Sequence, residues 1–252
     1  RRLRIGLAAM GLHRRGRRRR RCRRSVQVGG CGALVGAQPA VALGLGDGAV
    51  LWSGLRRAHA PVQGRVGLVP HHKSYDGADW DAIALAAGLF PIDPRQSPET
   101  VTAALASCER VLTESLHGAI FADTLGIPWR PVVLARRFNN FKWGDWLDTL
   151  GMTLDAAEVH VELFDEVPFG KSIGNRLARW TNRGGIDARN HLRPVRAATA
   201  DDIARIVDQL RGFAAETSKF TVSDPARRTA QQAAMRERCA RFATDYGLLF
   251  AG

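Results

Sequence analysis

The chain has 252 residues, an apolar fraction of 45% and a formal net charge of +13, values that fit a globular protein with a buried core. No run of about 18 apolar residues marks a membrane span, and no apolar signal segment follows the basic N-terminus, so we expect a cytoplasmic protein. The four cysteines form no CxxC pair and have no histidine at metal-ligand spacing, which argues against a zinc motif or a disulfide framework.

Residues 1–40 account for nearly all of the net charge. Residues 1–24 contain twelve arginines and no acidic residue, so removing them lowers the formal charge from +13 to +1. Continuous like charge at 17–21 and the glycines of 29–36 both oppose folding. This arginine- and glycine-rich segment has three interpretations: a nucleic-acid-binding arm, a disordered tail, or out-of-frame translation of GC-rich DNA. We favour the third as a hypothesis, which a continuous upstream reading frame in the coding DNA would refute.

Residues 41–62 are predicted to be a linker or the remnant of an N-terminal domain. The glycine-punctuated segment Val41–Leu51 suggests a strand end with a turn at Asp47-Gly48. Its glycine spacing is not that of a dinucleotide-binding loop, so the turn is the better interpretation.

From Gly64 onward, apolar runs alternate regularly with helical patterns. Asp76 or Asp79 can cap the first helix, Ser97 can cap the next, and Gly88 is a suitable helix stop. We expect strands at 65–69, 89–92, 110–113 and 129–134, and helices at 79–87, 97–107, 116–125 and 142–150. This alternation predicts βαβ units and therefore an α/β fold, a Rossmann-like parallel sheet with flanking helices, over residues 63–150.

Residues 151–252 are predicted to be a helical extension that packs on this core. A short strand is expected at 159–163, and helices at 173–180, 199–216 and 225–246. Thr199 and Asp202 have the spacing that starts a helix, and the apolar residues that follow share one face.

Ligands of parallel sheets bind beyond the carboxyl ends of the strands, which selects the loops 71–77, 114–117 and 135–141. In the second loop a strand turns at Glu114-Ser115 into a helix that begins near His117. The start of that helix suits an anion, Gly118 would let the anion approach the backbone, and His117 could donate or transfer a proton. From the residues alone, however, a histidine in this place is more often a structural cap.

Other residues in these loops have two interpretations each. Lys73, Arg136, Arg137 and Lys142 could bind an anion, although each could be a solvated surface charge. His71 and His72 are adjacent without an acidic partner at ligand spacing, so we expect contacts to an anion or a sugar and no metal site.

The two tryptophans that follow also allow two interpretations. Trp143 and Trp146 could stack on a sugar, but their spacing favours core packing.

Several segments in the correct order resemble the polysaccharide pyruvyl transferase family, in particular the C-terminal half of its exopolysaccharide (succinoglycan) branch. They are Gly-Leu-Val-Pro-His-His-Lys (67–73), Ile-Asp-Pro-Arg (92–95), Ser-Leu-His-Gly-Ala-Ile-Phe-Ala (115–122) with Gly-Ile-Pro (126–128), and Arg-Phe-Asn-Asn-Phe-Lys-Trp-Gly-Asp-Trp (137–146).

The resemblance implies a transferase that moves the pyruvyl group of phosphoenolpyruvate onto a sugar with two free hydroxyls, giving a pyruvate ketal. Phosphoenolpyruvate is the donor substrate and no further cofactor is expected. The acceptor would be an exopolysaccharide sugar or its lipid-linked precursor, which would place the protein at the inner face of the membrane. His117 matches the family's histidine and would contact the donor and act as acid or base.

The predicted substrate-binding residues are His71, His72, Lys73, Glu114, Ser115, Gly118, Arg136, Arg137, Asn139 and Lys142. Glu114 would orient His117 or bind an acceptor hydroxyl, or it is a turn residue. Many family members have arginine where this chain has Ser115, and we expect the nearby cations to replace it.

The family's fold resembles a GT-B glycosyltransferase with two Rossmann-like domains, so this chain would provide one domain, with its N-terminal partner missing or corrupted. Two alternatives remain. A GT-B glycosyltransferase would bind the ribose of a nucleotide sugar with a carboxylate, for which Asp93 and Glu114 are candidates. A nucleic-acid binder would use the arginine-rich tail, although the near-neutral remainder of the chain argues against it.

Overall fold

The computed structural model describes residues 48–51, 61–160, 162–181 and 192–247, and the statements below refer to these residues. The arginine- and glycine-rich segment 1–40 lies outside the described residues, as does 41–47 of the predicted strand end.

Parallel strands form one sheet, as the alternating pattern predicted. They are β1 (Val66–Val69), β2 (Phe90–Pro91), β3 (Arg110–Thr113), β4 (Trp129–Val133) and β5 (Ala157–Glu158). Their order is β2-β1-β3-β4-β5, and every neighbouring pair is parallel. In β1 all four residues are buried, because helices cover both faces of the sheet. The predicted α/β class is therefore confirmed.

The helices mostly begin at the caps expected from the sequence. They are α1 (His72–Tyr75), α2 (Trp80–Ala86), α3 (Pro98–Ala106), α4 (Leu116–Thr124), α5 (Asn140–Leu150), α6 (Phe169–Thr181), α7 (Ala200–Ala215) and α8 (Pro225–Asp245), with the 3-10 helices η1 (Gly48–Leu51) and η3 (Thr217–Lys219). Asp79 accepts a hydrogen bond from Ala82 at the start of α2, and Thr199 forms a capping box at the start of α7. No described helix is long and apolar enough to cross a membrane.

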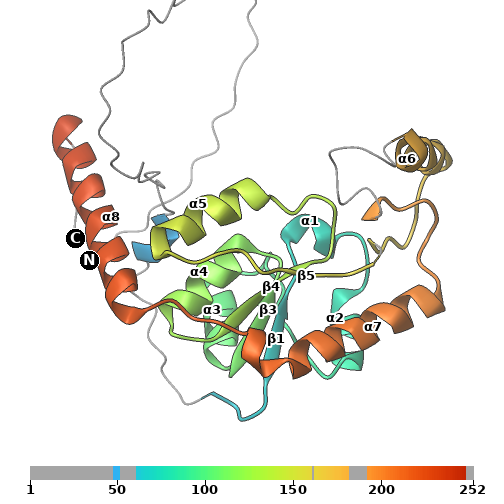
Figure 1. The fold of residues 1–252 in the computed structure, drawn as a ribbon, viewed down its shortest axis with the longest axis horizontal. Coiled ribbons are helices and arrows are strands. Elements are labelled where there is room, and N and C mark those ends of the chain that lie inside the picture. The colour runs from blue at the N-terminus through green and yellow to red at the C-terminus, as the bar shows by residue number, and fades with distance from the viewer. Residues whose placement is uncertain (1–47, 52–60, 161, 182–191, 248–252) are drawn as a thin grey trace, which may run out of the picture. The chain divides into compact units, whose positions relative to one another are not determined.

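The helices lie on the two faces of the sheet. In Figure 1, α2 and α7 lie together on one side of the strands, and α3 and α4 lie together on the other. This arrangement follows from right-handed crossovers, since the chain moves from β1 to β2 in one direction and from β3 to β4 in the other.

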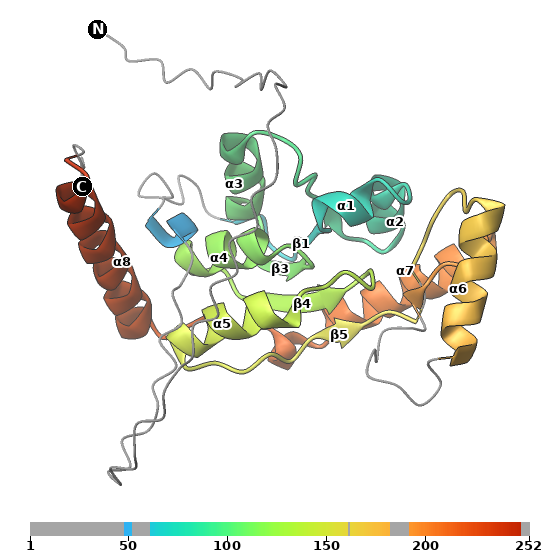
Figure 2. The ribbon, with the colours of Figure 1, turned by 90° about the horizontal axis from the view of Figure 1, so that it is seen from above.

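Residues after α7 return to the sheet. Thr221 pairs with Trp129 of β4 in an antiparallel bridge, and Ser223 donates two hydrogen bonds to the buried carboxylate of Asp123 on α4. Helix α8 then contacts α5 and η1, as the view from above shows (Figure 2).

Aromatic rings fill the space between β4 and α5. Trp129, Trp143 and Trp146 are each 1–2% exposed, and the ring centroids of Trp129 and Trp146 lie 5.3 Å apart. The expectation that Trp143 and Trp146 pack in the core is confirmed.

Three local predictions are corrected by the structure. Residues 48–51 form the 3-10 helix η1, which inserts Val50 into the core, in place of a strand end. The last strand lies at 157–158 and not at 159–163, because its partner β4 ends at Val133, opposite Glu158. The loop 71–77 contains the short helix α1, whose four residues are too few to show a helical period.

Candidate active site

A cleft of about 380 Å³ opens at the carboxyl edge of the sheet. It lies where β1 and β3 are neighbours, although the chain leaves β1 toward β2 and leaves β3 toward β4. Such a reversal separates the loops that follow two adjacent strands and leaves a crevice for a ligand. Its lining comes from the segments that follow β1, β3 and β4, as the loop prediction required. The lining residues are His71, His72, Lys73, Ser74, Glu114, Ser115, Leu116, His117, Arg137, Phe138, Asn139, Lys142 and Trp143.

Nine of the predicted site residues therefore meet in one cleft: His71, His72, Lys73, Glu114, Ser115, His117, Arg137, Asn139 and Lys142. Gly118 and Arg136 do not line it. Sequence reasoning missed Ser74, Leu116 and Phe138 as lining residues, and it favoured core packing over a place in the site for Trp143. Each of them is next to a predicted residue, and that adjacency was the signal available in the sequence.

The start of α4 forms one wall of the cleft. The Ser115 hydroxyl caps the helix by accepting a hydrogen bond from the Gly118 amide at 3.4 Å. His117 is in the first turn with its side chain exposed, and its ring stacks on Phe121 at a centroid distance of 6.3 Å. A helix N-terminus carries a partial positive charge, so this wall favours an anion.

Gly118 has a packing role in this structure. A Cβ atom there would lie 2.6 Å from the Thr113 hydroxyl oxygen and 3.2 Å from a methyl group of Val69. The absence of a side chain therefore lets α4 lie close against the ends of β1 and β3, which brings His117 to the edge of the cleft.

Glu114 is a buried carboxylate that connects three strand ends. One oxygen accepts from the His71 amide at 2.9 Å, after β1, and the other accepts from the Ala135 amide at 2.8 Å, after β4. The Ser74 hydroxyl and the Leu134 amide add two more hydrogen bonds. Only 3% of Glu114 is exposed, and this burial raises its pKa to about 7 against the opposing effect of those hydrogen bonds. Glu114 thus holds the loops of the cleft relative to one another.

His71 is held in a cationic environment. Its Nδ1 atom accepts a hydrogen bond from the Lys73 amide at 3.3 Å, and its ring centroid is 4.1 Å from that of His72. Burial is the largest cause that lowers the His71 pKa, and together with the charges of His72, Lys73, Lys142 and Arg137 it brings this pKa to about 4. His71 is therefore neutral at neutral pH and available as a hydrogen-bonding group.

Three cationic side chains converge on the cleft. Within the described part of the chain, Lys73, Arg137 and Lys142 form no ion pair, and Glu114, already engaged with backbone amides, is the one acidic residue in the lining. Glu162, which is outside the lining, interacts electrostatically with Arg137. The excess of positive over negative side chains in the lining favours an anionic ligand. The neighbouring Arg136 is half-buried instead, and its amide donates to the carboxylate of Glu162.

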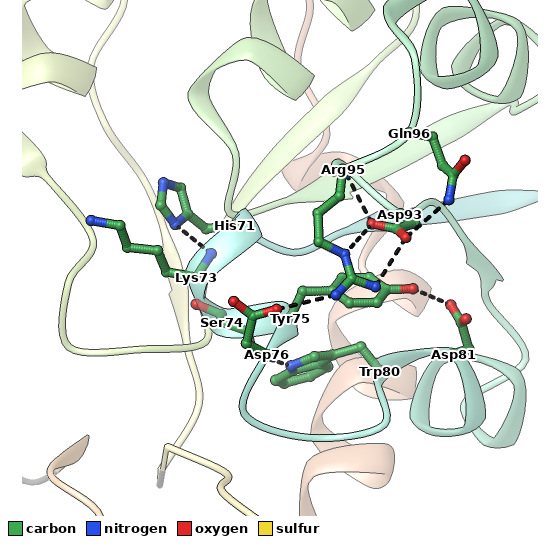
Figure 3. A network of polar contacts seen from close by, with 10 residues as sticks. All are labelled: His71, Lys73, Ser74, Tyr75, Asp76, Trp80, Asp81, Asp93, Arg95 and Gln96. Carbon is green, nitrogen blue, oxygen red and sulfur yellow. Dashed lines mark hydrogen bonds and ion pairs between the residues drawn. The ribbon is translucent and has the colours of Figure 1, made fainter. Parts of the chain in front are cut away.

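A polar network holds α1 in place behind the cleft (Figure 3). The Arg95 guanidinium pairs with Asp93 and Asp76 and lies 4.2 Å from the centre of the Tyr75 ring. His71 and Lys73 lie on the other side of α1, pointing away from this network. The network thus fixes the short helix from which these cleft residues extend.

The carboxylates considered for a nucleotide ribose are both engaged within the protein. Asp93 accepts hydrogen bonds from Arg95 and Gln96, and Glu114 is buried among backbone amides. Among the residues that the structure describes, no three His, Cys, Asp or Glu side chains are grouped to hold a metal ion.

Fold and cleft together define a doubly wound α/β domain with a cleft lined by cationic side chains at its switch point. The family profile "Polysaccharide pyruvyl transferase" matches residues 60–134, which include β1 to β4 and α4. This segment is therefore similar to the polysaccharide pyruvyl transferase family, the family that its motifs resemble.

A curated protein is also similar to part of this chain. The "Succinoglycan biosynthesis protein ExoV" of Rhizobium meliloti (strain 1021) is 38% identical over 144 residues, which is 55% of this chain. The matched part is 43% of the length of that relative. No solved structure matches the chain.

Proposed function

We propose that the cleft binds phosphoenolpyruvate and that the chain provides the donor site of a pyruvyl transferase acting on a polysaccharide sugar. The observation that carries this proposal is the meeting of Lys73, Arg137 and Lys142 with the N-terminus of α4 in one cleft. The family match and the relative named for succinoglycan biosynthesis support a polysaccharide acceptor.

The chemistry of the donor suits these side chains. Phosphoenolpyruvate carries a phosphate and a carboxylate, so it needs cationic donors at two positions. Arg137 can bind a carboxylate or phosphate through two parallel N–H groups, whereas Lys73 and Lys142 act as point charges. The α4 N-terminus adds amide dipoles, and Asn139 adds an uncharged amide in the same lining.

The proposed reaction starts with a proton transfer to the terminal CH₂ carbon of the donor, which becomes a methyl group. Positive charge then develops on the carbon that carries the phosphate, and a sugar hydroxyl adds there and loses its proton. The C–O bond to phosphate breaks with its electron pair, and the second hydroxyl adds to the same carbon and also loses a proton. Of the two hydroxyl protons, one replaces the proton given to the methyl group and the other goes to the departing phosphate oxygen, so the products are the ketal and inorganic hydrogen phosphate.

His117 is the proposed proton carrier, because an exposed imidazole at the cleft can give a proton to the donor carbon and take one from the sugar hydroxyl. Lys73, Arg137 and Lys142 would stabilise the departing phosphate, whose charge grows as the bond breaks. His71, neutral and with its Nδ1 atom already accepting from the Lys73 amide, would donate a hydrogen bond from Nε2 without adding charge.

The acceptor is proposed to be a sugar with two free hydroxyls in a lipid-linked oligosaccharide or in the polymer. Trp143 is too buried to offer a ring face to it, at 2% exposed. Phe141, in the first turn of α5 beside Lys142, is 82% exposed and is the better candidate to stack on the sugar.

Calorimetric titration of the chain with phosphoenolpyruvate, and separately with a nucleotide sugar, tests the proposal. We expect phosphoenolpyruvate to bind, and His117→Ala to weaken binding by about tenfold, since a hydrogen bond to a charged group contributes roughly 1.5–3 kcal/mol. The control is Lys171→Ala, which removes a cation on α6 outside the cleft lining. Binding of the nucleotide sugar but not of phosphoenolpyruvate would contradict the proposal.

A further inference from the structure

Helix α6 presents an exposed apolar face. Phe169, Ile173, Leu177 and Trp180 are 82%, 51%, 60% and 69% exposed. Their spacing of four, four and three residues places them on one side of the helix. Clusters of large exposed apolar side chains are uncommon on protein surfaces and mark interaction sites.

The opposite face of α6 is attached to the segment 193–195. The Ser172 hydroxyl donates to the Val195 carbonyl, and the Asn175 amide donates to the Pro194 carbonyl. Asn175 is buried by this contact. The helix is therefore fixed with its polar side toward the protein and its apolar face outward.

The charge of α6 narrows the choice of partner. Its 13 residues include Lys171, Arg176 and Arg179 and no acidic residue. Arg176 is exposed and follows Phe169 by seven residues, so it lies at the border of the apolar face. An apolar face with aromatic side chains near both ends and a basic border is typical of helices that lie in the headgroup layer of a membrane.

We propose that α6 binds in the plane of an anionic lipid surface, with its apolar face toward the acyl chains and Arg176 toward the lipid phosphates. This proposal does not depend on the identity of the donor in the cleft. It would hold the enzyme at a surface where an acceptor attached to lipid is concentrated.

The fluorescence of Trp180 gives a local test. Trp80, Trp129, Trp143 and Trp146 are at most 2% exposed, so Trp180 is the exposed indole among the described residues. Adding vesicles of phosphatidylcholine with phosphatidylglycerol to the full chain should shift its emission to shorter wavelength, and Trp180→Phe should lose that shift. Adsorption through the arginine-rich residues 1–24 would leave Trp180 in water, so any shift would then persist in Trp180→Phe.

Paired substitutions distinguish binding through the apolar face of α6 from nonspecific adsorption of the protein to lipid. Leu177→Glu should reduce the fraction of shifted signal at least tenfold at a given lipid concentration, because it places a charge in the centre of the face. Leu85→Glu is the matched control, since Leu85 is 64% exposed on α2, and it should leave the shift unchanged. Absence of a shift in the unaltered chain, or a shift that persists in Leu177→Glu, would overturn the proposal. An equal shift with phosphatidylcholine alone would also overturn it.

Discussion

Replacing Glu114 by glutamine should change how the stability of the protein depends on pH. The carboxylate is buried at the ends of β1, β3 and β4, and it accepts hydrogen bonds from the amides of His71 and Ala135. Glutamine has nearly the same shape but cannot ionise. It also turns an NH₂ group toward one of those amide donors, which leaves a buried N–H without an acceptor.

The magnitude follows from the raised pKa of Glu114. In the unfolded chain the carboxyl titrates near 4.5, and in the folded protein near about 7, so the folded state holds the proton more tightly. The resulting stabilisation is fully present below pH 4.5 and is lost as the pH rises through 7. Between pH 5 and pH 8 the loss is about 2.5 kcal/mol. The unsatisfied donor in Glu114→Gln costs roughly 1–3 kcal/mol at every pH.

Urea unfolding of both chains at pH 5 and pH 8 measures this difference. We expect Glu114→Gln to be less stable than the unaltered chain at pH 5, and about equal to it or more stable at pH 8. The lowered pKa of His71 destabilises the folded state as the pH falls below 6.5. Because both chains contain His71, this contribution largely cancels when their free energies of unfolding are compared. The control Glu158→Gln, at an exposed position on β5, should show no such change. A stability difference that is the same at pH 5 and pH 8 would refute this account of Glu114.

Two further predictions concern stability and are read from thermal or urea unfolding. Gly118→Ala should destabilise the protein by roughly 1–3 kcal/mol, because the new methyl group would lie 2.6 Å from the Thr113 hydroxyl oxygen. The control is Gly144→Ala on α5, where a Cβ atom meets no atom within 4 Å, so this substitution should be neutral or stabilising. Equal effects at the two glycines would show that the close packing of α4 is not needed. Asp123→Ala should lower the free energy of unfolding by about 3 kcal/mol, since it removes the acceptor of two hydrogen bonds from Ser223. A decrease below about 0.5 kcal/mol would mean that this contact does not hold the segment after α7 against the sheet.

The local rules explain why most of the sheet and helices could be predicted. Asp79, Ser97 and Thr199 cap helices through short-range hydrogen bonds, and glycines with φ near +70° end them, so these signals act within a few residues. The loops at the carboxyl edge of the sheet could also be predicted, because their place follows from the alternation of strands and helices alone.

Features that depend on distant partners were not predictable in the same way. The length of β5 is set by the end of β4, and the segment 159–163 has an alternating pattern without a strand beside it. Glu114 is recognised as a buried acid only when the ends of three strands are brought together. For Gly118 the sequence suggested an approach to a ligand, whereas the neighbouring atoms are those of Thr113 and Val69.

Calorimetric titration with phosphoenolpyruvate of the unaltered chain, of Arg137→Ala and of Lys142→Ala tests the donor site most directly. The two residues line the cleft and form no ion pair among the described residues, so each substitution should weaken binding by roughly tenfold or more. Lys171→Ala should bind as the unaltered chain does. Binding that is unaffected by both cleft substitutions, in chains shown to be folded, would contradict the assignment of this cleft as the donor site.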